Sequence, residues 1–187
     1  MTLFKYNLTR RRLIKAAGGL AALGGISVFP PTALAQGVQT AKPDRLRAGA
    51  TVGLVTPASN VPENEDLLAA MDLVRSLGFK AKAAPNLRRR KQYLAGSDQQ
   101  RADDLNGMFA DDEVDAIFCV RGGYGSGSLL RDLDYQTIAN NPKILMGYSD
   151  ITAILNAIHG QTGMVTYHGP IAGDNFSSYT YEQFQRR

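Results

Sequence analysis

The chain has 187 residues, which is enough for one ordinary domain with an appendage and too short for two full domains. Its 44% hydrophobic and 20% charged residues exclude a disordered chain and a coiled coil. The formal net charge is +4, but residues 1–35 hold five basic residues and no acid, which leaves 16 basic against 17 acidic residues in 36–187. The basic excess therefore belongs to the N-terminus, and the composition argues against a nucleic-acid-binding body.

Residues 1–35 have the layout of a secretory signal peptide. Three consecutive arginines, residues 10–12, precede a mildly apolar stretch at 16–29 and an Ala-Leu-Ala end at 33–35. The apolar stretch is shorter than the roughly 20 residues that a membrane span needs. The arginines resemble a twin-arginine export signal, which predicts cleavage after Ala35 and an exported, periplasmic protein that meets the membrane only through this signal. An uncleaved amphipathic anchor is the alternative.

Beyond the signal, polar residues 36–47 indicate a leader, and residues 48–187 indicate one domain in which strands alternate with helices. In chain order we expect a strand at 51–56, a helix at 63–77, a weak strand at 79–84, a helix from Ser97 to about Ala110, strands at 114–120 and 143–146, a helix at 150–158 and a strand at 164–167. Ser97 and Gln100 have the spacing of a capping box. The alternation predicts an α/β fold with a parallel sheet flanked by helices, of the Rossmann or flavodoxin-like type.

The end of the chain has a second capping-box pattern, Thr180 with Gln183, and the sequence stops at Arg187. A helix this short is hardly stable by itself. We therefore expect a chain that is cut off where a new element begins, with a C-terminal domain absent.

Three stretches follow predicted strands at the edge where parallel sheets bind ligands, namely 56–59, 121–128 and 147–150. In the last of these, Ser149 lies at a tight turn from strand to helix, which suits a nucleophile because the helix N-terminus stabilises negative charge. The pattern is not the G-x-S-x-G elbow, since Ile151 replaces the second glycine. Ser149 as a plain helix N-cap is the alternative.

The second stretch is rich in glycine, at Gly122, Gly123, Gly125 and Gly127. Such a loop allows close approach of the backbone to a phosphate, a carboxylate or an oxyanion. No lysine stands in the Walker position, which disfavours a nucleotide site. The lone Cys119 lies in an apolar run and is expected to be a buried, inert thiol.

Several of these motifs occur together in a specific order. They are R-G-G-Y-G at 121–125, Leu129-Leu130, Asp134-Tyr135, K-I-L-M-G-Y-S-D-I-T at 143–152 and H-G-P at 168–170. The ordered set resembles the LD-carboxypeptidase family, the muramoyltetrapeptide carboxypeptidases to which microcin-immunity peptidases are related. The resemblance spans about residues 45–170 and corresponds to the N-terminal half of a family member.

The resemblance implies a serine-type carboxypeptidase, a hydrolase that removes the terminal D-alanine from a murein tetrapeptide by means of a Ser-His-Glu triad. Ser149 matches the nucleophile, and the backbone N–H groups of Asp150 and Gly123 would be the oxyanion donors. The substrate-binding residues would be Gly122, Tyr124 and His168. The family usually has an arginine where this chain has Ser128.

The resemblance places the triad Glu and His in the C-terminal domain. His159 would lie roughly three helical turns from Ser149, too far to be the base, and His168 matches a stretch outside the triad. We therefore expect this chain to be inactive alone. The resemblance implies no metal or cofactor and a murein peptide as partner. The charge distribution argues against nucleic acid as a partner, and a homodimer is an option for the intact protein. A non-catalytic muropeptide-binding domain or a decayed gene product is the alternative.

Overall fold

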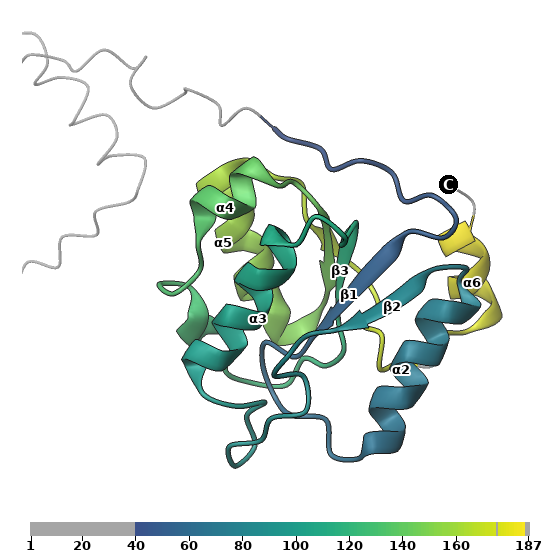
Figure 1. The fold of residues 1–187 in the computed structure, drawn as a ribbon, viewed down its shortest axis with the longest axis horizontal. Helices are drawn as coiled ribbons and strands as arrows, with labels where there is room; N and C mark the ends of the chain where they lie inside the picture. Colours follow the sequence, from purple (N-terminus) through teal and green to yellow (C-terminus); the bar gives the residue numbers. More distant parts are fainter. Residues whose placement is uncertain (1–39, 175, 186–187) are drawn as a thin grey trace, which may run out of the picture. The chain divides into compact units, whose positions relative to one another are not determined.

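The computed structural model of the chain describes residues 40–174 and 176–185. The predicted export signal and the first part of the leader lie outside the described residues. Five parallel strands form one sheet in the order β2-β1-β3-β4-β5 (Figure 1). They are β1 (Thr51–Val55), β2 (Lys80–Ala83), β3 (Ala116–Cys119), β4 (Ile144–Gly147) and β5 (Tyr167–His168). This strand order is that of flavodoxin-like folds, and it confirms the predicted α/β class.

Helices cover both faces of the sheet (Figure 1). On one face lie α3 (Asp98–Ala110), α4 (Tyr135–Asn140) and α5 (Thr152–Thr162), and on the other lie α2 (Asn64–Ser76) and α6 (Ser178–Gln185). Two short 3-10 turns, Ser126–Leu129 and Ser149–Ile151, follow β3 and β4. The ring of Phe184 in α6 meets Phe118 of β3 edge to face, with 5.8 Å between ring centroids.

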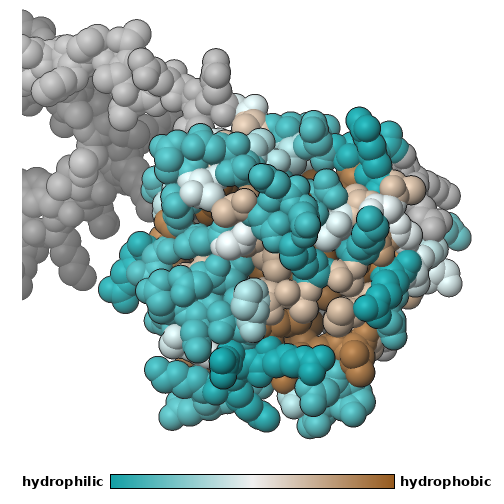
Figure 2. Space-filling model, in the orientation of Figure 1, coloured by the Kyte–Doolittle hydropathy of each residue, from teal (hydrophilic) through white to brown (hydrophobic). Residues whose placement is uncertain are grey.

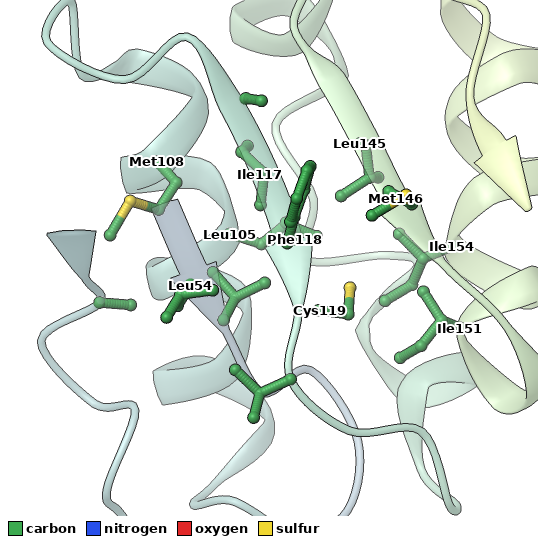
Figure 3. Close-up of a cluster of buried hydrophobic side chains, with 14 of the residues drawn as sticks. Leu54, Leu105, Met108, Ile117, Phe118, Cys119, Leu145, Met146, Ile151 and Ile154 are labelled. Atoms are coloured by element: carbon green, nitrogen blue, oxygen red, sulfur yellow. The ribbon is translucent and has the colours of Figure 1, made fainter. Parts of the chain in front are cut away.

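The core is centred on β3 and β4, in which every residue is buried. Figure 3 shows their side chains in one cluster with residues of β1, α3, α5 and the 3-10 turn before α5. The labelled members are Leu54, Leu105, Met108, Ile117, Phe118, Cys119, Leu145, Met146, Ile151 and Ile154. Strands buried on both faces have continuous apolar runs, which explains why these strands are evident in the sequence.

Two predicted details of the helices are resolved by the structure. The Ser97 capping box is confirmed, because Ser97 Oγ accepts the Gln100 N–H at 3.2 Å and Gln100 Oε1 accepts the Ser97 N–H at 3.0 Å. The predicted Thr180 cap is wrong, since α6 begins at Ser178 and Ser177 Oγ accepts the Thr180 N–H at 3.1 Å. The helix at residues 135–140 was not predicted.

The last strand begins later than predicted, at Tyr167, and has only two residues. Met164 instead pairs with Ala41 in an isolated parallel bridge. The Ala41 N–H donates to the Gly163 carbonyl at 3.0 Å, and the Val165 N–H donates to the Ala41 carbonyl at 2.8 Å. Ala41 of the expected leader is thus hydrogen-bonded to the segment that leads into β5, the edge strand of the sheet.

Figure 2 shows a largely hydrophilic surface on this face of the domain, with apolar side chains gathered in the region of β2 and α2. Leu68 of α2 is one of the large apolar residues that are exposed. Within residues 40–174 and 176–185, no helix is long and apolar enough to cross a membrane.

Candidate active site

Ser149 lies on the sharp turn between β4 and α5, and its side chain is exposed. Its φ is +60°, a left-handed conformation that costs a residue other than glycine about 1–3 kcal/mol. Gly147 makes the turn possible, because a Cβ there would lie 2.8 Å from Ile151 Cγ2. Neither the 3-10 turn nor α5 has a side-chain cap, so the alternative of Ser149 as a helix N-cap is wrong.

The glycine loop after β3 lies directly against Ser149. A Cβ at Gly122 would lie 3.3 Å from both Ser149 Cβ and the Tyr148 carbonyl oxygen. In the described part of the chain, the backbone N–H groups of Gly123 and Asp150 donate to no other residue. Two N–H groups beside an exposed hydroxyl are a suitable arrangement for holding an oxyanion.

Ser59, which follows β1, positions the glycine loop from the other side. Its hydroxyl accepts the Tyr124 N–H at 3.1 Å, and its own N–H donates to the Gly122 carbonyl at 3.2 Å. Gly123 has φ +104°, and a Cβ there would be 2.2 Å from Ser59 Oγ. Only glycine fits this position. The three stretches that the sequence analysis selected therefore meet at the carboxyl ends of β1, β3 and β4.

Asp150 connects the glycine loop to the Ser149 turn. Its carboxylate accepts the Ser126 N–H at 2.8 Å, and its carbonyl accepts the Ser126 hydroxyl at 2.5 Å. Ser126 is buried. The sequence predicted a role only for the Asp150 N–H, as an oxyanion donor. The structure shows that the Asp150 carboxylate also positions the glycine loop.

Arg101 in α3 is a residue of this site that the sequence analysis missed. It is buried, and its guanidinium donates to the Pro57 carbonyl at 2.6 Å and the Gly125 carbonyl at 2.9 Å. It therefore joins the loops after β1 and β3, and it also contacts Ser128 Oγ at 3.3 Å. The available signal was an arginine on the apolar stripe of the helix, four residues before Leu105.

The two histidines lie in different places. The exposed His168 ends β5, and its ring is 6.3 Å from the ring of Tyr148, the residue before Ser149. His159, at the end of α5, shares a hydrogen bond of 3.0 Å between its Nδ1 and the Met164 carbonyl. Within the described residues, no side chain is hydrogen-bonded to Ser149 Oγ.

Two other kinds of chemistry receive no support at this site. Cys119 is fully buried, and burial raises the pKa of its thiol to about 12, so the thiol stays protonated and inert. Among the described residues, no group of three or more His, Cys, Asp and Glu is arranged to hold a metal ion.

Fold and site together define a parallel α/β domain in which a strained, exposed serine lies at the carboxyl ends of the strands, against a glycine loop. The sequence model of the LD-carboxypeptidase N-terminal domain matches residues 52–169. The chain therefore belongs to the LD-carboxypeptidase family.

Relatives support this assignment. A probable murein peptide carboxypeptidase of Bacillus subtilis (strain 168) is 45% identical over 130 residues, which cover 70% of this chain and 40% of that protein. Among solved structures, an MccF-like protein from Bacillus anthracis str. Ames has a TM-score of 0.73 and 34% identity over 78% of this chain and 46% of that one. A muramoyltetrapeptide carboxypeptidase from Oxalobacter formigenes has a TM-score of 0.66 and 26% identity over 72% of this chain and 46% of that one. The chain thus spans less than half of the length of these relatives.

Proposed function

We propose that the protein is the nucleophile-bearing part of an exported serine-type carboxypeptidase that removes a terminal D-amino acid from murein peptides. The observation that carries this proposal is Ser149, held exposed at φ +60° against Gly122 and beside two N–H groups with no partner in the described part of the chain. Strain of this kind persists where the surrounding structure enforces it, and it is typical of functional sites. The murein peptide carboxypeptidases among the relatives supply the substrate class.

In the proposed reaction, Ser149 Oγ attacks the carbonyl carbon of the scissile peptide bond while a general base takes its proton. The N–H groups of Gly123 and Asp150 would stabilise the negative oxygen of the tetrahedral intermediate. Its collapse breaks the C–N bond, and the base returns the proton to the leaving amine of the D-amino acid. A water molecule then hydrolyses the acyl-serine ester and regenerates the hydroxyl.

The general base is assigned by the family resemblance to a Glu-supported His of the C-terminal domain. His159 does not fit the role, because it lies in the last turn of α5, roughly three helical turns away from Ser149. We therefore propose that the 187-residue chain alone releases little or no D-alanine.

A non-catalytic muropeptide-binding protein is the second candidate. It would rest on the loops after β1 and β3 and the Ser149 turn, which Ser59, Arg101 and Asp150 hold together without using Ser149 Oγ. These loops would then hold the peptide without cleaving it.

The deciding experiment compares the full-length product of the gene with its Ser149→Ala variant in D-alanine release from a murein tetrapeptide. Loss of activity by at least about 10³-fold is expected from removal of the nucleophile. The matched control is Ser178→Ala at an exposed serine of α6. Equal activity of Ser149→Ala and the parent would reject the proposal, whereas tight binding by both with no release by either would favour the binding protein.

Export is tested separately. Replacing the three arginines at 10–12 with lysines keeps the charge and removes the twin-arginine pattern. We expect this change to retain the protein in the cytoplasm, as cell fractionation would show. Unchanged export would exclude the twin-arginine route.

A further inference from the structure

The environment of Arg101 is unusual for a charged side chain. The side chain is fully buried, and within residues 40–174 and 176–185 its one ion pair is with Asp98, at 2.5 Å in the same helix. Its Nε finds no acceptor among the described residues. A buried charge with an unpaired N–H costs free energy, and apolar side chains of similar volume are often at least as stable in its place. Stability alone therefore does not explain an arginine at this position.

The guanidinium bridges the loops after β1 and β3. A single nitrogen, Nη1, donates both to the Pro57 carbonyl at 2.6 Å and to the Gly125 carbonyl at 2.9 Å. Gly125 has φ +107°, and a Cβ there would lie 2.5 Å from Leu94 Cδ2. The glycine loop therefore packs closely against the arginine because residue 125 has no side chain.

The same two loops meet again at the Gly122–Gly123 peptide. Ser59, two residues after Pro57, donates its N–H to the Gly122 carbonyl at 3.2 Å. In a trans peptide the carbonyl and the N–H point in opposite directions. The hydrogen bond from Ser59 therefore directs the Gly123 N–H away from Ser59, and this N–H is one of the two oxyanion donors of the proposed reaction.

We propose that Arg101 is a positioning residue of this reaction. By joining Pro57 to Gly125, it fixes the loop of Ser59 against the glycine loop and so sets the direction of the Gly123 N–H. Its effect on catalysis rests on the proposed function. Because an oxyanion donor acts in the transition state, loss of Arg101 should lower kcat and leave KM nearly unchanged.

The first measurement needs no activity. Amide hydrogen exchange of the 187-residue chain is followed by NMR in the parent and in Arg101→Met, which fills the space without donating hydrogen bonds. We expect the N–H groups of Ser59 and Tyr124 to exchange about tenfold faster in the variant, since the two loops separate more often. The control is the Ala84 N–H, which donates to the Leu54 carbonyl at 3.0 Å at the edge of the sheet and should exchange at the parent rate.

The second measurement is D-alanine release from a murein tetrapeptide by the full-length product of the gene. Arg101→Met should lower kcat by about 10²-fold and change KM by less than about threefold, as expected when an oxyanion donor is misplaced. Arg101→Lys should have an intermediate kcat, because an ammonium group can still donate to the two carbonyls. The controls are Arg131→Met, at an exposed arginine, and Phe109→Leu, at a buried residue roughly two turns further along α3. Both should keep the kcat of the parent, and Phe109→Leu shows the effect of weaker packing of the same helix.

Parent-like exchange at Ser59 in Arg101→Met would overturn the inference, whatever the role of Ser149. An unchanged kcat, or a loss that falls on KM alone, would overturn it as well. Faster exchange in a protein whose full-length parent releases no D-alanine would reject the proposed function and still support the fixing of the loops by Arg101. If Arg101→Met also loses protection at Ala84, the variant is unfolded, and Arg101→Lys replaces it in both measurements.

Discussion

Ser126 donates two hydrogen bonds to Asp150, from its N–H to the Asp150 carboxylate and from its hydroxyl to the Asp150 carbonyl. The pair joins two loops that are 24 residues apart in the sequence, the glycine loop and the Ser149 turn. The position of Gly122 against Ser149 therefore depends on a contact that neither residue makes itself.

Ser126→Ala should destabilise the protein by about 1–2 kcal/mol, because it removes a buried donor and leaves the Asp150 carbonyl without its partner. Urea unfolding of the variant and the parent measures this difference. The control is Ser178→Ala, at an exposed serine. A loss no larger than that of the control would show that the hydrogen bond from the Ser126 hydroxyl to the Asp150 carbonyl contributes nothing to stability.

The left-handed backbone of Ser149 predicts a difference between two small substitutions. Glycine adopts φ +60° without steric cost, whereas alanine retains the strain, so Ser149→Gly should be more stable than Ser149→Ala by about 1 kcal/mol. The free energy of unfolding in urea is the measurement. Gln92, at φ +56°, is a second site at which the glycine variant should have a larger free energy of unfolding than the alanine variant. The opposite order at residue 149 would contradict the enforced turn.

Gly123→Ala should destabilise the protein by about 2 kcal/mol or more, through a positive φ and a clash with Ser59 Oγ. Combining it with Ser59→Gly should recover part of the loss, because the clash is removed and the backbone strain remains. Gly127→Ala is the matched control in the same loop, since a Cβ there has no atom within 4 Å. Equal effects of the two alanine substitutions would show that the loop differs from its described conformation.

Cys119 should not react with thiol reagents in the native protein. Its side chain is fully buried, and burial raises the pKa of the thiol to about 12, so almost no thiolate exists near neutral pH. The reaction with a chromogenic disulfide reagent at pH 8 is followed by absorbance. No chromophore should be released from the reagent by the native protein, and one equivalent per chain should be released in denaturant. Rapid labelling of the native protein would place Cys119 at the surface.

Asp104 should make stability depend on pH in the acidic range. Burial raises its pKa above the ordinary 3.8, even though the Asn86 N–H donates to its carboxylate at 3.0 Å. As pH rises from 3.8 through the folded-state pKa, the unfolded chain releases its proton first, so the contribution of Asp104 to the unfolding free energy falls. The unfolding free energy of the parent minus that of Asp104→Asn, both from urea titrations, should therefore decrease with rising pH. A difference that grows with pH would reverse the sign of the shift.

The buried strands and the turn that carries Ser149 could be predicted because their information is local. Apolar runs mark β1, β3 and β4, and Gly147 and Ser149 follow the last of these runs directly. The six-residue α4 could not be predicted in the same way, since Ile138 is its single buried residue.

The contacts that shape the site could not be predicted from the sequence, because they join residues that are far apart in it. Ser59 and Tyr124 are 65 positions apart, and Arg101 and Pro57 are 44 positions apart. The start of the last strand is likewise set by long-range pairing, because Met164 pairs with Ala41 rather than with β4. Spacing within one segment carries no information about such pairs.

Ala41 pairs with the segment before β5, although it lies outside the matched family region, 52–169. The part of the chain needed for a stable fold is therefore longer than the family match. A chain shortened to begin at Thr51 would retain every residue of the family match, 52–169, but would leave the Gly163 carbonyl and the Val165 N–H without their partners. Those two groups lie next to the outermost strand, where an unpaired backbone can recruit the edge of another copy. Deletions at the N-terminus that stop before residue 40 should therefore give monodisperse protein, and deletions past residue 41 should promote self-association.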